Sequence, residues 1–189
     1  RRLNRTLGVK SRYVGYGDGD TLGVEALVMQ HYAQPDCGWA GWHCEGRPLQ
    51  VLFWLLCWDE IFASGLPDVF KTPYQDAPLD LDCCPLFFTN RRAALTARLA
   101  LLREAAPASL AAMVAESWRR HSGTLCRGVS WDRHSVRQLQ AVAAGLGGRG
   151  VAAVLATLSL SHKHFSGGMP DLLLLRLDKT GAATAAAGT

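Results

Sequence analysis

Residues 166–189 read SGGMPDLLLLRLDKTGAATAAAGT, and the first ten of them decide how the fold is interpreted. A pair of glycines permits a turn, Pro170 fixes its own φ, and Asp171 follows directly. The apolar run predicts a strand over 171–177 with Asp171 at its start. By itself the Pro-Asp pair is a modest signal, because aspartates in such turns commonly bond backbone amides. The stretch GLPDVF at 65–70 has the same form without a following strand, so Asp68 is interpreted as structural.

Composition indicates a folded, soluble protein of 189 residues, because 49% are hydrophobic and 19% are charged. The most apolar window, 49–58, is far shorter than the roughly 20 residues that span a bilayer, and it predicts a buried helix. The basic N-terminal stretch has no apolar segment after it and is no secretory signal. We therefore expect no membrane association.

Six cysteines are present, and their spacing argues against both disulfides and zinc. Cys57 falls in the predicted buried helix, Cys83 and Cys84 are adjacent, and no pair has the C-x-x-C spacing of a zinc site. Reduced thiols of a cytosolic or nuclear protein are expected.

Charge is distributed unevenly along the chain, although the net charge is only +4. Residues 45–90 contain seven acidic and two basic side chains, whereas residues 91–150 contain ten arginines and three acidic side chains. An acidic patch beside an arginine-rich arm suits a metal site next to a phosphate-rich ligand. Solvated helix faces explain the same pattern equally well.

Hydrophobic periodicity and capping signals predict mostly helices, with a strand at each end. A short strand is expected over 11–16, and irregular segments over 35–46 and 71–85, where Gly or Pro recurs. Ser135 is the expected N-cap of a later helix. The predicted helices span 24–34, 48–63, 90–105, 107–121, 135–148 and 149–162.

Six segments occur in the order and approximate spacing of one nuclease family. They are WHCEG (42–46), WDEIFASGLPDVF (58–70), YQDAPLDL (74–81), FFTNRRAALTARL (87–99), SWDRHS (130–135) and GGMPDLLLL (167–175). From about Ser11 to Leu175 the chain resembles the carboxy-terminal virus-type replication-repair nuclease module of the Fanconi-associated nucleases. The resemblance implies an α/β fold with a restriction-endonuclease-like PD-(D/E)xK core, mostly helical here with the catalytic sheet incomplete. Residues 1–40 would be a lead-in strand and helix, and 41–189 a partial nuclease domain.

The resemblance also assigns site residues. Glu45 matches the helical glutamate and Asp171 the strand aspartate that hold Mg²⁺ or Mn²⁺ in this family. Gln75 matches a polar active-site residue, and Lys163 matches a basic residue that helps receive the 5′-phosphate of a flap. The neighbouring His162 and His164 are not assigned to the metal, because hard divalent cations prefer oxygen ligands.

The family's returning Glu-x-Lys strand has no match in this sequence. Asp178 and Lys179 are adjacent and would point to opposite faces of a strand, so they do not substitute for it. We therefore expect little or no nuclease activity from the chain alone. We also expect its strand at 171–177 to lack pairing partners.

The resemblance implies a metal-dependent DNA endonuclease of 5′ flaps and a 5′-exonuclease that acts in interstrand-crosslink repair in the nucleus. Branched or flapped DNA would be the substrate, and an N-terminal domain absent here would bind the ubiquitinated Fanconi complex. One alternative is a catalytically dead DNA-binding or scaffold module that uses the arginine-rich helices. A third interpretation, an all-helical interaction domain unrelated to nucleic acid, requires the motif order to be chance.

Overall fold

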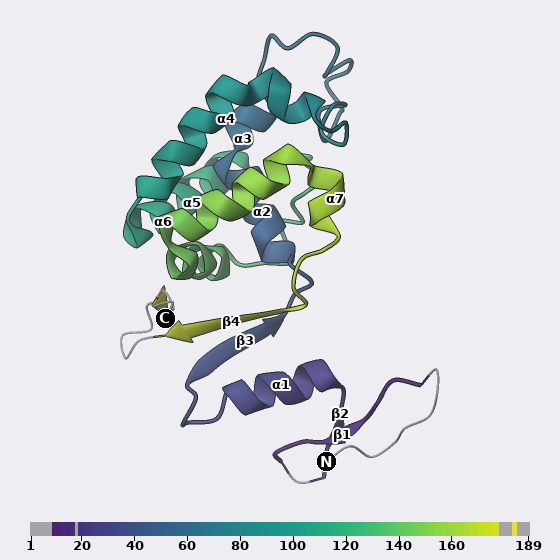
Figure 1. Cartoon of the computed structure of the whole chain (residues 1–189), viewed down its shortest axis with the longest axis vertical. Helices are drawn as coiled ribbons and strands as arrows, with labels where there is room; N and C mark the ends of the chain where they lie inside the picture. Colours follow the sequence, from purple (N-terminus) through teal and green to yellow (C-terminus); the bar gives the residue numbers. More distant parts are fainter. Residues whose placement is uncertain (1–8, 18, 178–182, 185–189) are drawn as a thin grey trace. The chain divides into compact units, whose positions relative to one another are not determined.

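The computed structural model of the chain describes residues 9–17, 19–177 and 183–184. Contacts divide the chain into two compact units, shown in Figure 1. The first comprises the chain up to Glu45 together with Pro170–Thr184, and the second comprises Gly46–Met169. The sequence-based boundary between residues 40 and 41 stays a prediction.

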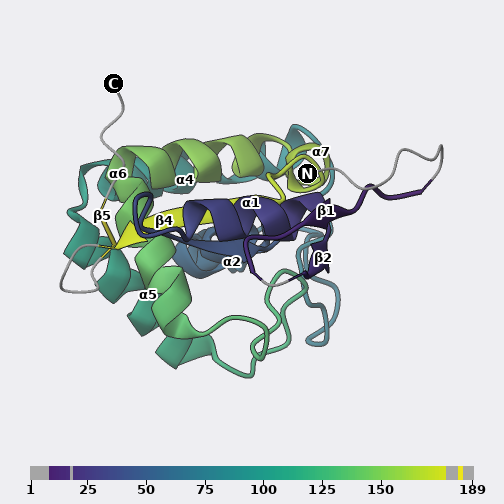
Figure 2. The same ribbon diagram turned by 90° about the horizontal axis from the view of Figure 1, so that it is seen from below.

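The first unit contains two small antiparallel sheets and one helix. Strands β1 (Tyr13–Val14) and β2 (Thr21–Leu22) form a hairpin, and helix α1 (Val24–Tyr32) follows. Strand β3 (Trp39–His43) pairs with β4 (Leu172–Leu177), which pairs with β5 (Ala183–Thr184). Helix α1 packs on β3, and both views of the unit show it running beside the β3–β4 ribbon (Figures 1 and 2).

Two predictions about this unit were wrong. The segment 39–43 was expected to be irregular, and β4 was expected to lack partners, yet the two strands pair from Trp39↔Arg176 to His43↔Leu172. Glycine is depleted in strands, so the local sequence around Gly41 gave no strand signal. Glycine suits this position because a side chain has no room there: a Cβ at Gly41 would lie 2.8 Å from Leu174 Cδ2. Pairing with a segment about 130 residues away supplies the hydrogen bonds that local sequence did not indicate.

The second unit is helical and is built around α2 (Arg47–Leu56). Eight of the ten α2 residues are buried, and Leu52, Phe53 and Trp54 are fully so. The predicted helix over 48–63 is interrupted at Cys57, where the backbone leaves the helical region, and continues as α3 (Trp58–Ile61). No Gly or Pro lies at this break, so packing rather than local sequence determines it.

Three longer helices and one short one complete this unit. They are α4 (Leu86–Glu104), α5 (Pro107–His121), α6 (Val136–Leu160) and α7 (His162–Ser166). Ser135 caps α6 as predicted, with its hydroxyl accepting from the Gln138 N–H. The two helices expected over 135–162 form one element that is broken at Gly147, where φ is 66°.

Helix α6 is also long and apolar enough to cross a membrane by length and composition alone. It packs against α2, α4 and α5, and core helices of soluble proteins pass the same test. No disulfide links any of the six cysteines, all of which lie within the described residues. Burial raises the pKa of the Cys57 thiol far above its ordinary value and that of Cys126 to about 11.

Candidate functional site

Glu45 and Asp171 meet where the β3–β4 ladder ends. Beyond the His43↔Leu172 pair, the N–H groups of Cys44 and Glu45 both donate to the carbonyl oxygen of Asp171, at 2.9 and 3.2 Å. Both acidic residues are exposed. The structure thus brings together two predicted site residues that are 126 positions apart in the sequence.

The backbone of Glu45 is unusual. Its φ of 47° lies in the left-handed region, which costs a non-glycine residue on the order of 1–3 kcal/mol. Gly46 follows with φ 66° and caps the start of α2. A strained residue at the turn between β3 and α2 is consistent with a functional role for Glu45. Asp68 shares the positive φ, at 60°, but lies in an irregular loop without a neighbouring strand.

Two exposed carboxylates suit Mg²⁺ or Mn²⁺, because hard cations prefer oxygen ligands. Within the described part of the chain, no group of three or more His, Cys, Asp or Glu side chains is placed to hold a metal. Glu45 and Asp171 therefore fit as part of a ligand set. Asp178 and Lys179, considered above as substitutes for the Glu-x-Lys pair, lie outside the described residues.

Gln75 is half-buried in the long connection between α3 and α4 and holds that connection in shape. Its Oε1 accepts from the backbone N–H groups of Lys71 and Thr72. Its Nε2 donates to the carbonyl oxygens of Val69 and Ala77, at 3.2 and 3.4 Å. The described contacts of Gln75 are thus those of a loop-fixing residue, and its catalytic assignment stays a prediction.

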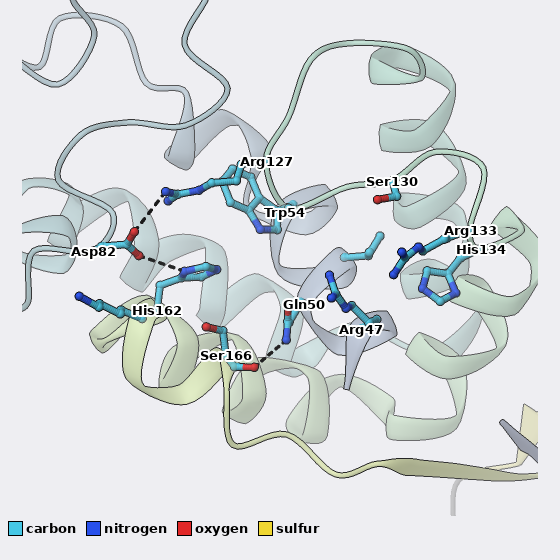
Figure 3. A pocket seen from close by; sticks show the side chains of 13 residues that line it. Arg47, Gln50, Trp54, Asp82, Arg127, Ser130, Arg133, His134, His162 and Ser166 are labelled. Atoms are coloured by element: carbon cyan, nitrogen blue, oxygen red, sulfur yellow. Dashed lines mark hydrogen bonds and ion pairs between the residues drawn. The ribbon is translucent and has the colours of Figure 1, made fainter. Parts of the chain in front are cut away.

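Lys163 lines a basic cavity of about 330 Å³ within the second unit. Arg47 comes from the first turn of α2, Arg127 and Arg133 from the segment between α5 and α6, and Lys163 from α7. Asp82 is the only acid among the described residues that line the cavity. Figure 3 labels Arg47, Asp82, Arg127 and Arg133 around it. We call this hollow the basic cavity; its other lining residues are Gln50, Val51, Trp54, Gly128, Ser130, His134, His162 and Ser166.

Asp82 is held at one side of the basic cavity by two partners. Its Oδ2 lies 3.1 Å from Arg127 Nη1, and its Oδ1 lies 3.4 Å from His162 Nδ1, as drawn in Figure 3. Burial lowers the pKa of His162 despite the opposing effect of Asp82. Burial likewise lowers the pKa of His134, and the charges of Arg133 and Arg47 add to this effect. The cavity therefore favours uncharged imidazoles among fixed cations.

Three buried nitrogen atoms of the basic cavity's lining have no hydrogen-bond partner: Trp54 Nε1, His134 Nε2 and His162 Nε2. Trp54 is fully buried, and Gly128 packs directly against its indole nitrogen, since an added Cβ would lie 1.6 Å from it. Buried polar groups without partners cost free energy. A water molecule, an ion or a polar ligand in the basic cavity would supply the missing partners.

Sequence reasoning found Lys163 but missed the rest of the basic cavity. Arg127 and Arg133 were included only as members of the arginine-rich segment, and Arg47 lies in the segment that was considered acidic. His162 was considered only as a metal ligand. The available signal was the excess of arginine over 91–150, which does not indicate which side chains converge.

Part of the charge asymmetry is cancelled within the second unit. Arg91 pairs with Asp80, and Arg98 lies 3.2 Å from Glu60 and 3.7 Å from Asp59. Arg91 and Asp80 are buried, so neither contributes to an exposed patch. The acidic and arginine-rich segments therefore neutralise each other in part rather than forming two separate surfaces.

Comparison with known proteins finds relatives among DNA nucleases. Residues 105–184 match the family model of the VRR-NUC domain. The Fanconi-associated nuclease 1 homolog of Oryza sativa subsp. japonica is 42% identical over 186 residues, which is 98% of this chain and 19% of that protein. Fanconi-associated nuclease 1 of Homo sapiens is 43% identical over 152 residues, covering 80% of this chain and 15% of that protein.

The fold is likewise similar to a solved structure. The crystal structure of paFAN1 bound to 5′-flap DNA with a 2-nucleotide flap and a gap aligns with a TM-score of 0.72 and 25% identity, over 93% of this chain and 31% of that one. This match supports the α/β nuclease fold, which is mostly helical with small sheets. The chain spans about a fifth of the length of the curated relatives that it matches. On the domain match, the identity and the shared fold, the chain belongs to the Fanconi-associated nuclease family.

Proposed function

We propose that this chain contributes two metal ligands and a phosphate-binding cavity to a structure-specific, metal-dependent DNA nuclease. The observation that carries the proposal is the meeting of Glu45 and Asp171 through the backbone at the end of β3 and β4. The family relationship and the flap DNA named for the solved relative support it.

Glu45 and Asp171 would hold Mg²⁺ or Mn²⁺ through their exposed carboxylates. Such an ion neutralises charge on the phosphoryl group and activates a water molecule for phosphodiester hydrolysis. Lys163 would bind the 5′-phosphate of a flap, together with Arg47 and Arg133 of the basic cavity. Arginine suits this task because its planar fork matches a phosphate group. Gln75 would act indirectly by fixing the loop that carries it.

The cellular role follows from the family. The proposed substrates are branched or flapped DNA, cut endonucleolytically at 5′ flaps and exonucleolytically from 5′ ends, during interstrand-crosslink repair in the nucleus. Recruitment to the ubiquitinated Fanconi complex would depend on sequence outside this chain. The names of the relatives support the repair role.

The metal assignment is tested by Mn²⁺ binding, measured by electron paramagnetic resonance on the chain. Glu45→Gln and Asp171→Asn should each weaken binding about tenfold or more, because even residues that only support metal ligands contribute factors of roughly 10–100. Asp68→Asn is the matched control, since it alters the other Gly-x-Pro-Asp turn. Equal Mn²⁺ affinity in all four proteins would contradict the assignment.

A DNA-binding module that does not cut is the second candidate. Four cations that could bind DNA line the basic cavity, whereas the described residues bring together only two carboxylates that could hold a metal. This difference favours DNA binding without cleavage. Cleavage of a 5′-flap substrate in Mg²⁺, abolished by Asp171→Asn, would exclude it. Salt-sensitive DNA binding by a chain that does not bind Mn²⁺ would favour it.

A further inference from the structure

His162 and Asp82 both line the basic cavity, and the hydrogen bond between them fixes the tautomer of His162. A carboxylate only accepts hydrogen bonds, so Nδ1 must carry the hydrogen that bonds Asp82 Oδ1 at 3.4 Å. In the neutral ring Nε2 is then a bare acceptor. That atom is buried and lacks a partner. It becomes a donor only when the imidazole takes up a second proton.

The surroundings of His162 oppose that proton as long as the basic cavity holds no anion. Asp82 faces the ring from the loop before α4, but Arg127 already neutralises this carboxylate at 3.1 Å. Lys163 follows on α7 itself. The remaining charged or titratable lining groups are Arg47 from α2 and, from the segment before α6, Arg133 and His134. The aromatic rings of Phe53 and Trp54, centred 5.7 and 5.9 Å from the imidazole, add no charge.

We propose that His162 takes up a proton from solvent when a phosphate group enters the basic cavity, and that its Nε2–H then donates to that phosphate. Occupancy of the cavity is thereby coupled to one proton. The negative charge of the phosphate stabilises the protonated imidazole among the cations of the lining. The protonated Nε2 gains a hydrogen-bond partner, which it lacks when the cavity holds no phosphate. Burial, which lowers the pKa of the free imidazole, leaves it neutral and ready to accept the proton near pH 7. The inference rests on the proposed function only in taking phosphate as the ligand.

The charges of the basic cavity suit a terminal phosphate better than an internal one. A terminal phosphate monoester carries about −1.5 to −2 charges near pH 7 and offers three acceptor oxygens, whereas an internal diester carries one charge. Four fixed cations and a protonated imidazole, with Asp82 as the only acid, favour the doubly charged ligand. The charges of the basic cavity therefore suit the 5′-phosphate already proposed as the ligand of Lys163 better than an internal linkage.

Proton uptake is measured by isothermal titration calorimetry at pH 7.5, in buffers of differing ionisation enthalpy that contain EDTA. The probes are a single-stranded oligonucleotide with a 5′-phosphate and the same oligonucleotide with a 5′-hydroxyl. At this pH the phosphate, whose second pKa is about 6, is already dianionic, so a proton that is taken up enters the protein. The wild-type chain should take up a proton with the 5′-phosphate probe alone.

His162→Gln should abolish most of that uptake, and Asp82→Asn should reduce it by removing the carboxylate that stabilises the charged ring. His164→Gln is the matched control, because His164 is exposed on the same helix and does not line the basic cavity. Between pH 8 and 7, wild-type affinity for the 5′-phosphate should rise by up to about tenfold, the limit for one linked proton. The His162→Gln profile should be flatter.

Equal proton uptake by wild type and His162→Gln would overturn the proposal, as would equal uptake with 5′-phosphate and 5′-hydroxyl probes. Failure of the wild-type chain to bind the 5′-phosphate end in preference to the 5′-hydroxyl would also overturn it. Circular dichroism of each variant separates loss of fold from loss of proton coupling. Because metal is chelated and no cleavage is measured, an absence of nuclease activity leaves this test unaffected.

Discussion

Arg91 Nη1 lies 2.7 Å from Asp80 Oδ2, and this ion pair is buried, with 1% and 8% of the two side chains exposed. Arg91 also donates from Nε to the carbonyl oxygen of Glu60 at 2.9 Å. Asn90 Nδ2 donates to the same Asp80 oxygen at 2.8 Å. The pair thus fixes the long α3–α4 connection against the first turns of α4.

Removing one member of this pair should destabilise the second unit strongly. Arg91→Met leaves the Asp80 carboxylate buried without its cation, a change that costs roughly 3–5 kcal/mol. Arg92→Met, at the exposed neighbouring position, should cost little. Urea unfolding followed by circular dichroism measures both. The double variant Arg91→Met, Asp80→Leu should recover much of the loss, and an unchanged urea midpoint in Arg91→Met alone would contradict the structure.

The contact between Gly128 and Trp54 should tolerate no side chain. Gly128→Ala places a Cβ 1.6 Å from Trp54 Nε1, so the segment that carries Arg127 must move. Overpacking of this kind costs about 1–3 kcal/mol. Gly167→Ala is the control, because it meets nothing within 4 Å and has a φ of −85°. Thermal unfolding should separate the two variants by several degrees, and equal Tm values would refute the contact.

Arginines of the basic cavity should account for part of the salt dependence of DNA binding. Each phosphate contact that is lost lowers the slope of log K against log salt by about 0.9 for duplex DNA. Arg47→Gln and Arg133→Gln should each produce a decrease of that order, measured by fluorescence anisotropy over 50–200 mM salt. Arg119→Gln should not, because Arg119 bonds Glu116 at 2.7 Å on the surface of α5. Identical slopes in all variants would place DNA elsewhere on the chain.

Stability should fall as the pH drops below about 6.5, the ordinary pKa of histidine. Burial lowers the pKa of His121, His134 and His162 in the folded chain. The unfolded chain therefore binds protons that the folded chain does not, and unfolding becomes easier as pH falls toward the lowered values. Urea midpoints between pH 7.5 and 5.5 measure the slope. His162→Gln should flatten it, and a wild-type midpoint that rises on acidification would contradict this account.

Local features of the second unit followed from the sequence. Helix α5 was predicted with the residues that the structure gives it, Pro107–His121, because an N-terminal proline and a single apolar face are local signals. The same holds for Ser135 as the cap of α6. Such features depend on residues within a few turns of one another, so no knowledge of the rest of the chain is needed.

The two candidate sites differed in how far the sequence defined them. The family resemblance assigned Glu45 and Asp171 to one metal site, which stays a prediction; the structure shows that the Glu45 N–H donates to the Asp171 carbonyl oxygen. The sequence did not predict the basic cavity, because its arginines come from separate segments. In the sequence they cannot be distinguished from arginines that form ion pairs elsewhere. Arg91 and Arg133 are alike in sequence, yet the first is buried against Asp80 while the second lines the cavity.

By itself, the sequence determined the family, most of the helices and the placement of Asp171 at the start of a strand. Only the tertiary structure decided that residues 39–43 are a strand, that α2 ends at Cys57, and which cations converge with His162. The physical reason is the sequence separation over which each kind of interaction acts. Helical periodicity and capping act within a few residues, whereas strand pairing and the burial of charge depend on segments that only folding brings together.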